Sequence, residues 1–243
     1  MSRSGYVAWD SGVGKWLPTQ PSMISPDGAN YIAQDAANIQ IADARTGSVL
    51  RTVLPGDYNF VFAYTASAIY AEHTGMNTIP GLWRIDPSTG SVTQLQTSSD
   101  SVQWAIVDVN GAWGTHTTAD NVTTIKRLDF STRAITDISQ PPVQDSVALV
   151  GSVGAGVLVA LAGSNFGIVA AFIVNPDGST VTVDVPAALL GKPLSPLGHF
   201  QDGPVVFFSG VGFGLAAYEQ GLGFGVLTDA PQDMFLLGKC RPN

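Results

Sequence analysis

Three histidines are the residues of this chain best suited to hold a metal, and two of them recur in a pattern. His73 lies 13 residues before Asp86, and His116 lies 13 residues before Asp129. His199 is the third imidazole of the chain. Imidazole nitrogens ligate zinc-like ions, so the pattern indicates a metal site that uses His73, His116 and His199. A bound divalent metal, zinc or calcium, would activate water and polarise a carbonyl or phosphoryl group.

Three aspartates follow nearly the same spacing as the histidines. Asp57, Asp100 and Asp145 are separated by 43 and 45 residues, and each lies in a polar loop-like segment. Their carboxylates could ligate calcium or serve as a general base beside a metal. Alternatively, two of them at a suitable separation could perform glycosidase-type acid–base chemistry. We therefore take these three residues as candidate catalytic groups.

Aromatic side chains provide a second route to function. Tyr58, Trp104 and Trp113 lie at or near expected loops and strand ends. Exposed aromatic rings near a central funnel would stack on sugar faces, which makes them candidate ligand-binding residues. The competing interpretation is that such rings pack inside the fold, and for Trp104 the two interpretations are equally weighted.

A structural interpretation competes with every one of these roles. Aspartate at the start of a turn accepts hydrogen bonds from backbone amides, so it recurs wherever the turn recurs. A histidine at a strand end often contacts only solvent or a neighbouring carbonyl. The recurrence alone is therefore compatible with a metal or ligand site, with a carboxylate pair and with a purely structural repeat.

The elements that must position these residues follow from the repeat itself. The phrases "DARTGSV", "DPSTGSV" and "DFSTRAI" begin at Asp43, Asp86 and Asp129, each 43 residues after the last. A fourth copy, "NPDGSTV", begins at Asn175, and a weaker fifth copy surrounds Glu219. A fixed period of about 40–50 residues is typical of β-propeller blades.

The pattern predicts an all-β propeller of four-stranded blades in a single domain, residues 1–243. Apolar runs such as "VLVALA" and "PVVFF" are typical of inner strands that are covered on both faces. We expect six blades, the sixth being formed by both termini, and five blades is the alternative. The expected repeats are 21–55, 57–98, 100–140, 144–186 and 196–229, with residues 1–20 and 231–243 forming the closing blade.

Blade geometry places two kinds of connection on one face of a propeller, where ligands usually bind. These are the connections from the second to the third strand and those from blade to blade. The predicted strand ends put His73 and His116 in the first kind and the three aspartates in the second. The sequence thus predicts that imidazoles and carboxylates share one funnel.

Composition excludes several classes of protein. The net charge is −8 with only 11 Lys and Arg, which argues against nucleic-acid binding. Residues 146–176 contain no charged residue, but their glycines divide the segment into short runs typical of buried strands, so we expect no membrane span. The first ten residues lack the apolar core of a signal peptide. Cys240, the single cysteine, is expected to be an inert thiol or to pair outside the chain.

Two phrases resemble the TolB-type β-propeller repeat. "SPDGANYIAQ" (Ser25 to Gln34) is followed by "IQIADARTGSV", and "GLWRIDPSTG" resembles the third-strand turn of the same family. The chain is also similar to secreted or lipid-anchored bacterial propeller proteins, which implies an extracellular or periplasmic location. The resemblance implies a fold without a chemistry, because TolB-type repeats occur in binding proteins and beside hydrolase domains.

We therefore expect a propeller that binds a small molecule, a carbohydrate or a protein partner at its funnel face. The first alternative is a metal-dependent hydrolase or lyase that acts on an ester, a lactone or a phosphotriester. The second alternative is a structural fragment of a larger envelope protein. Convergent His and Asp side chains would favour the enzyme, whereas an aromatic or apolar funnel would favour the binding protein.

Overall fold

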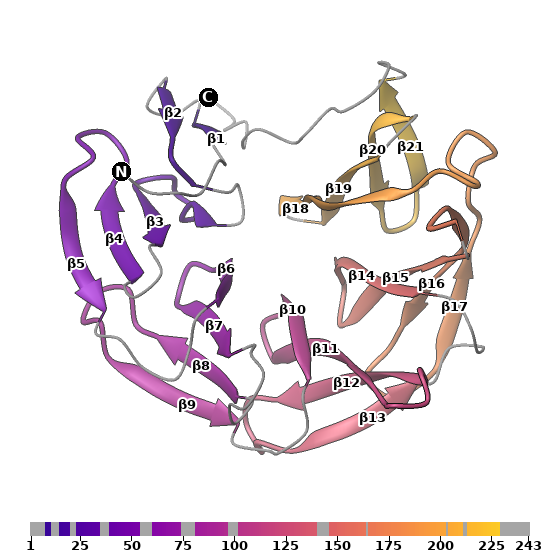
Figure 1. Ribbon diagram of the computed structural model, residues 1–243, viewed down its shortest axis with the longest axis horizontal. Coiled ribbons are helices and arrows are strands. Elements are labelled where there is room, and N and C mark those ends of the chain that lie inside the picture. Colours follow the sequence, from indigo (N-terminus) through magenta and orange to yellow (C-terminus); the bar gives the residue numbers. More distant parts are fainter. Residues whose placement is uncertain are drawn as a thin grey trace. The chain divides into compact units, whose positions relative to one another are not determined.

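The protein is represented by a computed structural model that consists of antiparallel β-sheets (Figure 1). It describes residues 8–10, 15–19, 23–34, 39–53, 60–73, 81–96, 102–139, 146–163, 165–202, 204–210 and 213–228. Every named element within these ranges is a strand, which confirms the all-β prediction. The chain divides into two compact units, one of Met1–Gln103 with Leu237–Asn243 and one of Trp104–Leu236. Each unit is described by itself.

The first unit contains three sheets in which successive strands pair. The strands are β1 (Ala8–Asp10) and β2 (Lys15–Leu17); β3 (Asn30–Gln34), β4 (Ile39–Asp43) and β5 (Val49–Val53); and β6 (Phe60–Tyr64), β7 (Ile69–His73), β8 (Gly81–Ile85) and β9 (Val92–Gln96). The four-stranded unit predicted for residues 57–98 is present as β6–β9. In the first repeat, Ile24, one of the described residues before β3, forms an isolated bridge with Tyr31.

The second unit contains three four-stranded antiparallel sheets. They comprise β10 (Gln103–Val107), β11 (Gly111–Thr117), β12 (Thr123–Asp129) and β13 (Ile135–Ser139); β14 (Ser146–Val153), β15 (Gly156–Ala162), β16 (Ile168–Val174) and β17 (Thr180–Val183); and β18 (Leu194–Asp202), β19 (Val205–Gly210), β20 (Gly214–Glu219) and β21 (Gly223–Thr228). The uncharged segment 146–176 thus forms three strands, as expected. Within the described residues, no helix is long and apolar enough to cross a membrane.

The repeated phrase forms the turn between the third and fourth strand of a sheet. Asp86 Oδ1 accepts hydrogen bonds from Ser88 N (2.7 Å), Ser88 Oγ (2.6 Å) and Thr89 N (3.0 Å). These bonds, led by the Ser88 hydroxyl, lower the pKa of Asp86 to about 2 because they stabilise its charged form. Gly90 then adopts a φ of +76°, which closes the turn. The turn chemistry accounts for the recurrence of aspartate in this phrase.

Among the described residues of the first unit, two apolar cores lie against the β3–β5 sheet. One lies between the β3–β5 and β6–β9 sheets and includes Ile32, Val53, Ile69 and Trp83. The other, on the opposite face of β3–β5, includes Leu17 of β2, and Thr19 Oγ1 donates to the Ile32 carbonyl (2.6 Å). The β1–β2 hairpin therefore packs on the β3–β5 sheet. Residues 231–243, expected to form part of a closing blade, lie outside the described ranges.

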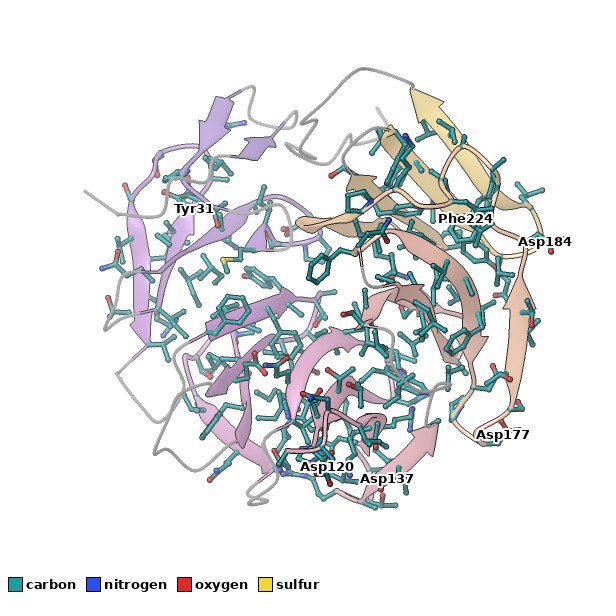
Figure 2. The ribbon with its side chains drawn as sticks, turned by 45° about the vertical axis from the view of Figure 1, so that its right-hand side comes forward. Tyr31, Asp120, Asp137, Asp177, Asp184 and Phe224 are labelled. Atoms are coloured by element: carbon teal, nitrogen blue, oxygen red, sulfur yellow. The ribbon has the colours of Figure 1, made fainter. Side chains whose placement is uncertain are left out.

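The second unit is held by a core between each pair of successive sheets. Trp113 and Ile125 pack with β14–β16, and Leu158 and Val206 belong to the core shared with β18–β21. Ser152 of β14 and Gln201 of β18 are joined by three hydrogen bonds of 2.8–3.0 Å. Figure 2 shows the exposed carboxylates at the periphery of this unit, which are those of Asp120, Asp137, Asp177 and Asp184.

Candidate functional site

Each four-stranded sheet has two ends, which we name by their connections. The turn end carries the turns from first to second and from third to fourth strand. The loop end carries the connection from second to third strand and the connection to the next sheet. β7 ends at His73, and β11 ends one residue after His116, so both histidines lie at a loop end as predicted.

Most predicted site residues cannot be placed relative to one another. Asp57, Tyr58, Asp100 and Asp145 lie outside the described residues. The backbones of His73 and His199 belong to β7 and β18, but their side chains are not described. The roles of these six residues stay predictions.

His116 is the predicted metal ligand whose side chain is described. It is half-buried on β11 and pairs with Thr124 of β12. The described side chains contain no group of three or more His, Cys, Asp or Glu that could hold a metal ion. Because His73 and His199 lie outside that set, the metal site is neither supported nor contradicted.

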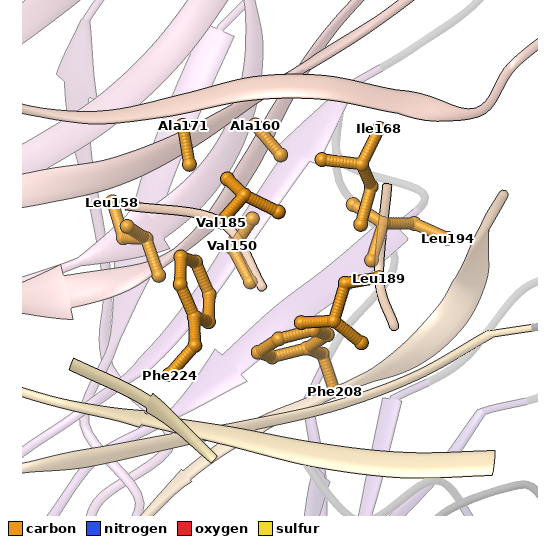
Figure 3. A pocket seen from close by; sticks show the side chains of 10 residues that line it. All are labelled: Val150, Leu158, Ala160, Ile168, Ala171, Val185, Leu189, Leu194, Phe208 and Phe224. Carbon is orange, nitrogen blue, oxygen red and sulfur yellow. The ribbon is translucent and has the colours of Figure 1, made fainter. Parts of the chain in front are cut away.

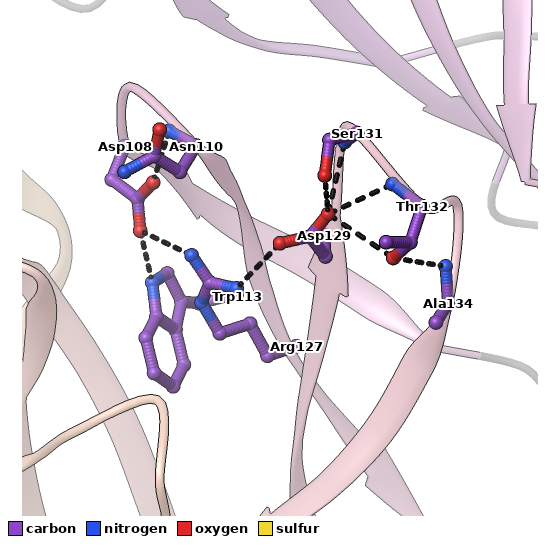
Figure 4. A network of polar contacts seen from close by, with 8 residues as sticks. All are labelled: Asp108, Asn110, Trp113, Arg127, Asp129, Ser131, Thr132 and Ala134. Carbon is purple, nitrogen blue, oxygen red and sulfur yellow. Dashed lines mark hydrogen bonds and ion pairs between the residues drawn. The ribbon is translucent and has the colours of Figure 1, made fainter.

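Trp104 and Trp113 do not have the exposed rings that were predicted. Trp113 is fully buried, and Trp104 is 2% exposed. The Trp113 indole Nε1 donates to Asp108 Oδ2 (2.7 Å), and the Arg127 guanidinium lies 5.2 Å from the centre of its ring (Figure 4). Stacking on a sugar needs an exposed ring face, so the burial of these two rings gives no support to their predicted ligand-binding role, which stays a prediction.

Trp113 instead belongs to a polar network at the turn end of the β10–β13 sheet (Figure 4). Arg127 Nη2 lies 3.6 Å from Asp108 Oδ2, and Arg127 Nη1 lies 3.7 Å from Asp129 Oδ2. The side chains of Arg127 and Asp108 are 9% and 5% exposed. A buried cation flanked by two carboxylates and a tryptophan ring joins strands β10, β11 and β12, so we assign this network to the fold.

The loop end of the β6–β9 sheet carries polar groups that the sequence interpretation overlooked. Glu72 of β7 and Gln96 of β9 both pair with Leu82 of β8. Residues directly opposite in antiparallel strands point to the same face, so Glu72, Leu82 and Gln96 form one row across the sheet. We call this row the polar row. It lies next to His73, which follows Glu72.

The members of the polar row are buried although two of them are polar. Glu72 and Gln96 are each 5% exposed, and Leu82 is fully buried. Neither the Oε1 nor the Nε2 atom of Gln96 has a hydrogen-bond partner. An unsatisfied buried polar group costs about 1–3 kcal/mol, so native proteins retain few of them without a reason. A bound molecule with donors and acceptors would satisfy this carboxamide.

A signal for the polar row exists in the sequence. Glu72 interrupts the apolar strand "AIYAEH", and the residue 43 positions later in the repeat is Thr115. The neighbouring repeat forms the same strand with a smaller neutral side chain at this position. The repeated fold therefore does not need a carboxylate there. The candidate site was predicted from histidines and from aspartates in loops, whereas Glu72 lies within a strand.

The described residues also enclose a small apolar cavity between the β14–β17 and β18–β21 sheets (Figure 3). Its volume is about 10 Å³. The lining is wholly apolar and comprises Val150, Leu158, Ala160, Ile168, Ala171, Val185, Leu189, Leu194, Phe208 and Phe224. A space that would fit about one water molecule and offers it no polar partner is a packing defect, so we do not assign a ligand to it.

Comparison with known proteins identifies the fold. A TolB-type protein from Agrobacterium tumefaciens is 13% identical, with a TM-score of 0.62, over 88% of this chain and 83% of that chain. The oligogalacturonate lyase from Vibrio parahaemolyticus is 11% identical, with a TM-score of 0.56, over 85% of this chain and 64% of that chain. These likenesses show that the chain has a TolB-like β-propeller fold. They confirm the predicted all-β, TolB-like propeller fold, whereas the number of blades stays a prediction, and they transfer no activity.

TolB from Acinetobacter baumannii is also similar, at 15% identity and a TM-score of 0.49 over 81% of this chain. The match spans 50% of that chain, so this protein corresponds to about half of its length. No protein-family model and no curated protein matches the sequence.

Proposed function

We propose that this protein is a β-propeller binding protein that takes a small polar ligand at the loop end of its β6–β9 sheet. The observation that carries the proposal is the buried carboxamide of Gln96, neither of whose polar atoms has a partner. Buried polar groups with unmet hydrogen-bonding capacity are costly to the fold and are found where a ligand, ion or water completes them.

The residues around Gln96 define the chemistry of the ligand. A carboxamide offers two donors and one acceptor, and a carboxylate such as Glu72 offers acceptors only. A ligand with several hydroxyl groups, such as a sugar, supplies donors and acceptors in matching number. This chemistry agrees with the predicted carbohydrate or small-molecule ligand.

The test is a titration followed by the side-chain amide signals of ¹⁵N-labelled protein. The probes are a panel of neutral monosaccharides, uronic acids and amino acids, each added at millimolar concentration. We expect at least one class to shift the Gln96 Nε2 signals while the Gln94 signals stay fixed, because Gln94 is exposed on the same strand. If ligands shift signals elsewhere and never those of Gln96, this site is not where they bind.

The likeness to a lyase supports a second candidate function. In this alternative, a divalent metal bound by His73, His116 and His199 activates water or a substrate oxygen, and Asp57, Asp100 or Asp145 acts as base. The metal content of protein purified without chelator tests it directly. The lyase or hydrolase proposal expects about one metal ion per chain, lost in His73→Ala/His116→Ala. A metal-free wild type after soaking in zinc and calcium would contradict it.

The wider architecture that we propose has six blades. The packing of Leu17 and Thr19 on the β3–β5 sheet supports a closing blade whose first half is the β1–β2 hairpin. We propose residues 231–243 as its second half. The resemblance to secreted bacterial propellers supports an extracellular or periplasmic location.

A further inference from the structure

An apolar patch is exposed at the loop end of the β14–β17 sheet. Phe166 is 67% exposed, Val169 is 47% exposed and Leu190 is 44% exposed. Ala187 and Ala188, next to Leu190 in the connection from β17 to β18, are exposed as well. We call these five residues the apolar patch. Single exposed apolar residues need no explanation, but a group of them on neighbouring loops indicates an interaction surface.

The two loops that carry the patch are held together by their backbones. Ile168 N donates to the Lys192 carbonyl (3.0 Å), and Gly191 N donates to the Ile168 carbonyl (2.8 Å). Gly167 is so close to Gly191 that a Cβ atom there would lie 2.4 Å from the Gly191 carbonyl oxygen. Leu189, in the connection from β17 to β18, is fully buried and fixes this connection to the core. The patch is therefore preformed, which lowers the entropy lost on association.

Phe166 is held in an unfavourable conformation. Its φ is +60°, which is rare for a bulky side chain, and its amide donates to the Gly163 carbonyl (2.8 Å). Glycine or asparagine would occupy this position without strain. Strained residues persist where the strain serves a purpose, and here the turn places an aromatic ring in solvent. The strain and the exposure together point to a partner that covers the ring.

Two residues of opposite charge flank Leu190 in the sequence. Asp184 and Lys192 lie at the two ends of the connection that carries Leu190, and both are exposed. Between residues 146 and 183 the chain has a single charged residue, Asp177, whereas the whole protein has a net charge of −8. This is thus a surface of low charge on an acidic protein. In a twofold pair, Lys192 of each copy would face Asp184 of the other.

We propose that the apolar patch is a homodimer interface whose occupant is a second copy of this chain. In this dimer the apolar patch of one copy packs against the apolar patch of the other. Phe166 and Leu190 lie in the centre of the interface, and the two Asp184–Lys192 pairs lie at its rim. A patch of five side chains is small for a protein interface, so we expect the dimer to be weak. Its dissociation constant is expected at about 10–1,000 μM, in the range of transient contacts.

Sedimentation velocity over about 5 μM to 1 mM protein tests this proposal, with the range chosen to bracket that weak affinity. We expect a reversible monomer–dimer equilibrium in the wild type. Phe166→Gly and Leu190→Ser should each weaken dimerisation at least about tenfold. Phe166→Gly also suits the positive φ of this position, so we expect the turn to keep its conformation, and circular dichroism checks that the variant is folded. Leu222→Ser, which changes an 80% exposed leucine outside the patch, is the matched control and should leave the equilibrium unchanged.

A charge exchange distinguishes this pairing from non-specific association. Asp184→Lys and Lys192→Asp should each weaken the dimer, because each places like charges opposite each other. The double variant restores opposite charges across the twofold axis and should recover the wild-type equilibrium. A monomer at every concentration would overturn the proposal. So would a dimer that persists in Phe166→Gly/Leu190→Ser or a double variant that fails to recover.

Discussion

The β6–β9 and β10–β13 sheets are two copies of one repeat, 43 residues apart, and they differ in an instructive way. At the turn end, both use an arginine of the third strand to brace the turn from first to second strand. Arg84 Nη2 donates to the Ser67 carbonyl (3.3 Å), and Arg127 lies between Asp108 and Asp129. The arginine is shared, and within the described residues charged partners are found for Arg127 and not for Arg84.

At the loop end the two sheets differ more. The polar row of the β6–β9 sheet has buried Glu72 and Gln96, whereas the corresponding positions of the β10–β13 sheet are Thr115 and Ser139. Both sheets form the same strands, so the fold does not require Glu72 or Gln96. Residues shared by the copies maintain the sheet, and the costly polar residues found in one copy are the candidates for function.

The largest difference should appear when each arginine is removed. Arg127→Ala leaves the buried carboxylate of Asp108 without its cation, so we expect a loss of about 3–5 kcal/mol in the free energy of unfolding. Arg84→Ala removes one exposed hydrogen bond and should cost at most about 1 kcal/mol. Urea unfolding of both variants measures the contrast. Equal losses would show that the two sheets are braced alike.

The repeated turns provide a second contrast, between Gly90 and Gly47. Both have a φ of +76°, but a Cβ at Gly90 would lie 2.7 Å from Arg51 Cδ, whereas one at Gly47 meets nothing within 4 Å. Gly47→Ala should therefore cost only the backbone strain, about 1–2 kcal/mol. Gly90→Ala should cost about 1 kcal/mol more, because Arg51 must move and lose its bond to the Thr89 carbonyl (2.9 Å). Thermal unfolding and urea unfolding of both variants measure the two losses in the free energy of unfolding.

The pH dependence of the turns should follow their hydrogen bonds. The pKa of Asp86 is lowered to about 2, so its stabilising contribution is present above the ordinary carboxyl pKa near 4 and is lost as the pH falls through about 2. Ser88→Ala removes the largest cause of the shift and should raise the pKa of Asp86. Carboxyl ¹³C titration measures this, with Asp129, whose pKa is lowered mainly by the Ser131 hydroxyl, as the internal control.

The smallest effect is expected at Arg133, which occupies the turn position of Gly47 and Gly90. It adopts a φ of +61°. Arg133→Gly relieves about 1–2 kcal/mol of strain but adds about 0.5–1 kcal/mol of chain entropy to the unfolded state. We expect a net stabilisation of at most about 1 kcal/mol, measured by urea unfolding. A clear destabilisation would mean that the contacts of the Arg133 side chain outweigh its strain.

The sequence predicts most of the fold because the fold repeats. The Asp43, Asp86 and Asp129 turns locate the connection to the last strand of their sheets, and the uncharged segment 146–176 forms strands as predicted. In the first repeat, the described residues that precede β3 form the isolated bridge between Ile24 and Tyr31. Local turn chemistry thus carries enough information to place strands.

The candidate site was predicted less well, for a physical reason. Trp113 was expected in a binding role because it lies near a strand end, but burial depends on neighbouring sheets that the local sequence does not specify. Asp108 and Arg127 are separated by 19 positions, and their contact depends on the register of three strands. Glu72 and Gln96 share a face only because both pair with Leu82. Each of these relations is a property of pairing between strands.

The central claim is that Gln96 is retained for binding at the expense of stability, and one substitution tests it. Gln96→Leu keeps a similar volume and removes a buried carboxamide whose polar atoms have no partner. We predict that urea unfolding will show a gain of about 1–2 kcal/mol in the free energy of unfolding, while Gln94→Leu, at an exposed position, changes it by less than about 0.5 kcal/mol. A loss of stability in Gln96→Leu would mean that this side chain supports the fold, and it would contradict the proposed binding site.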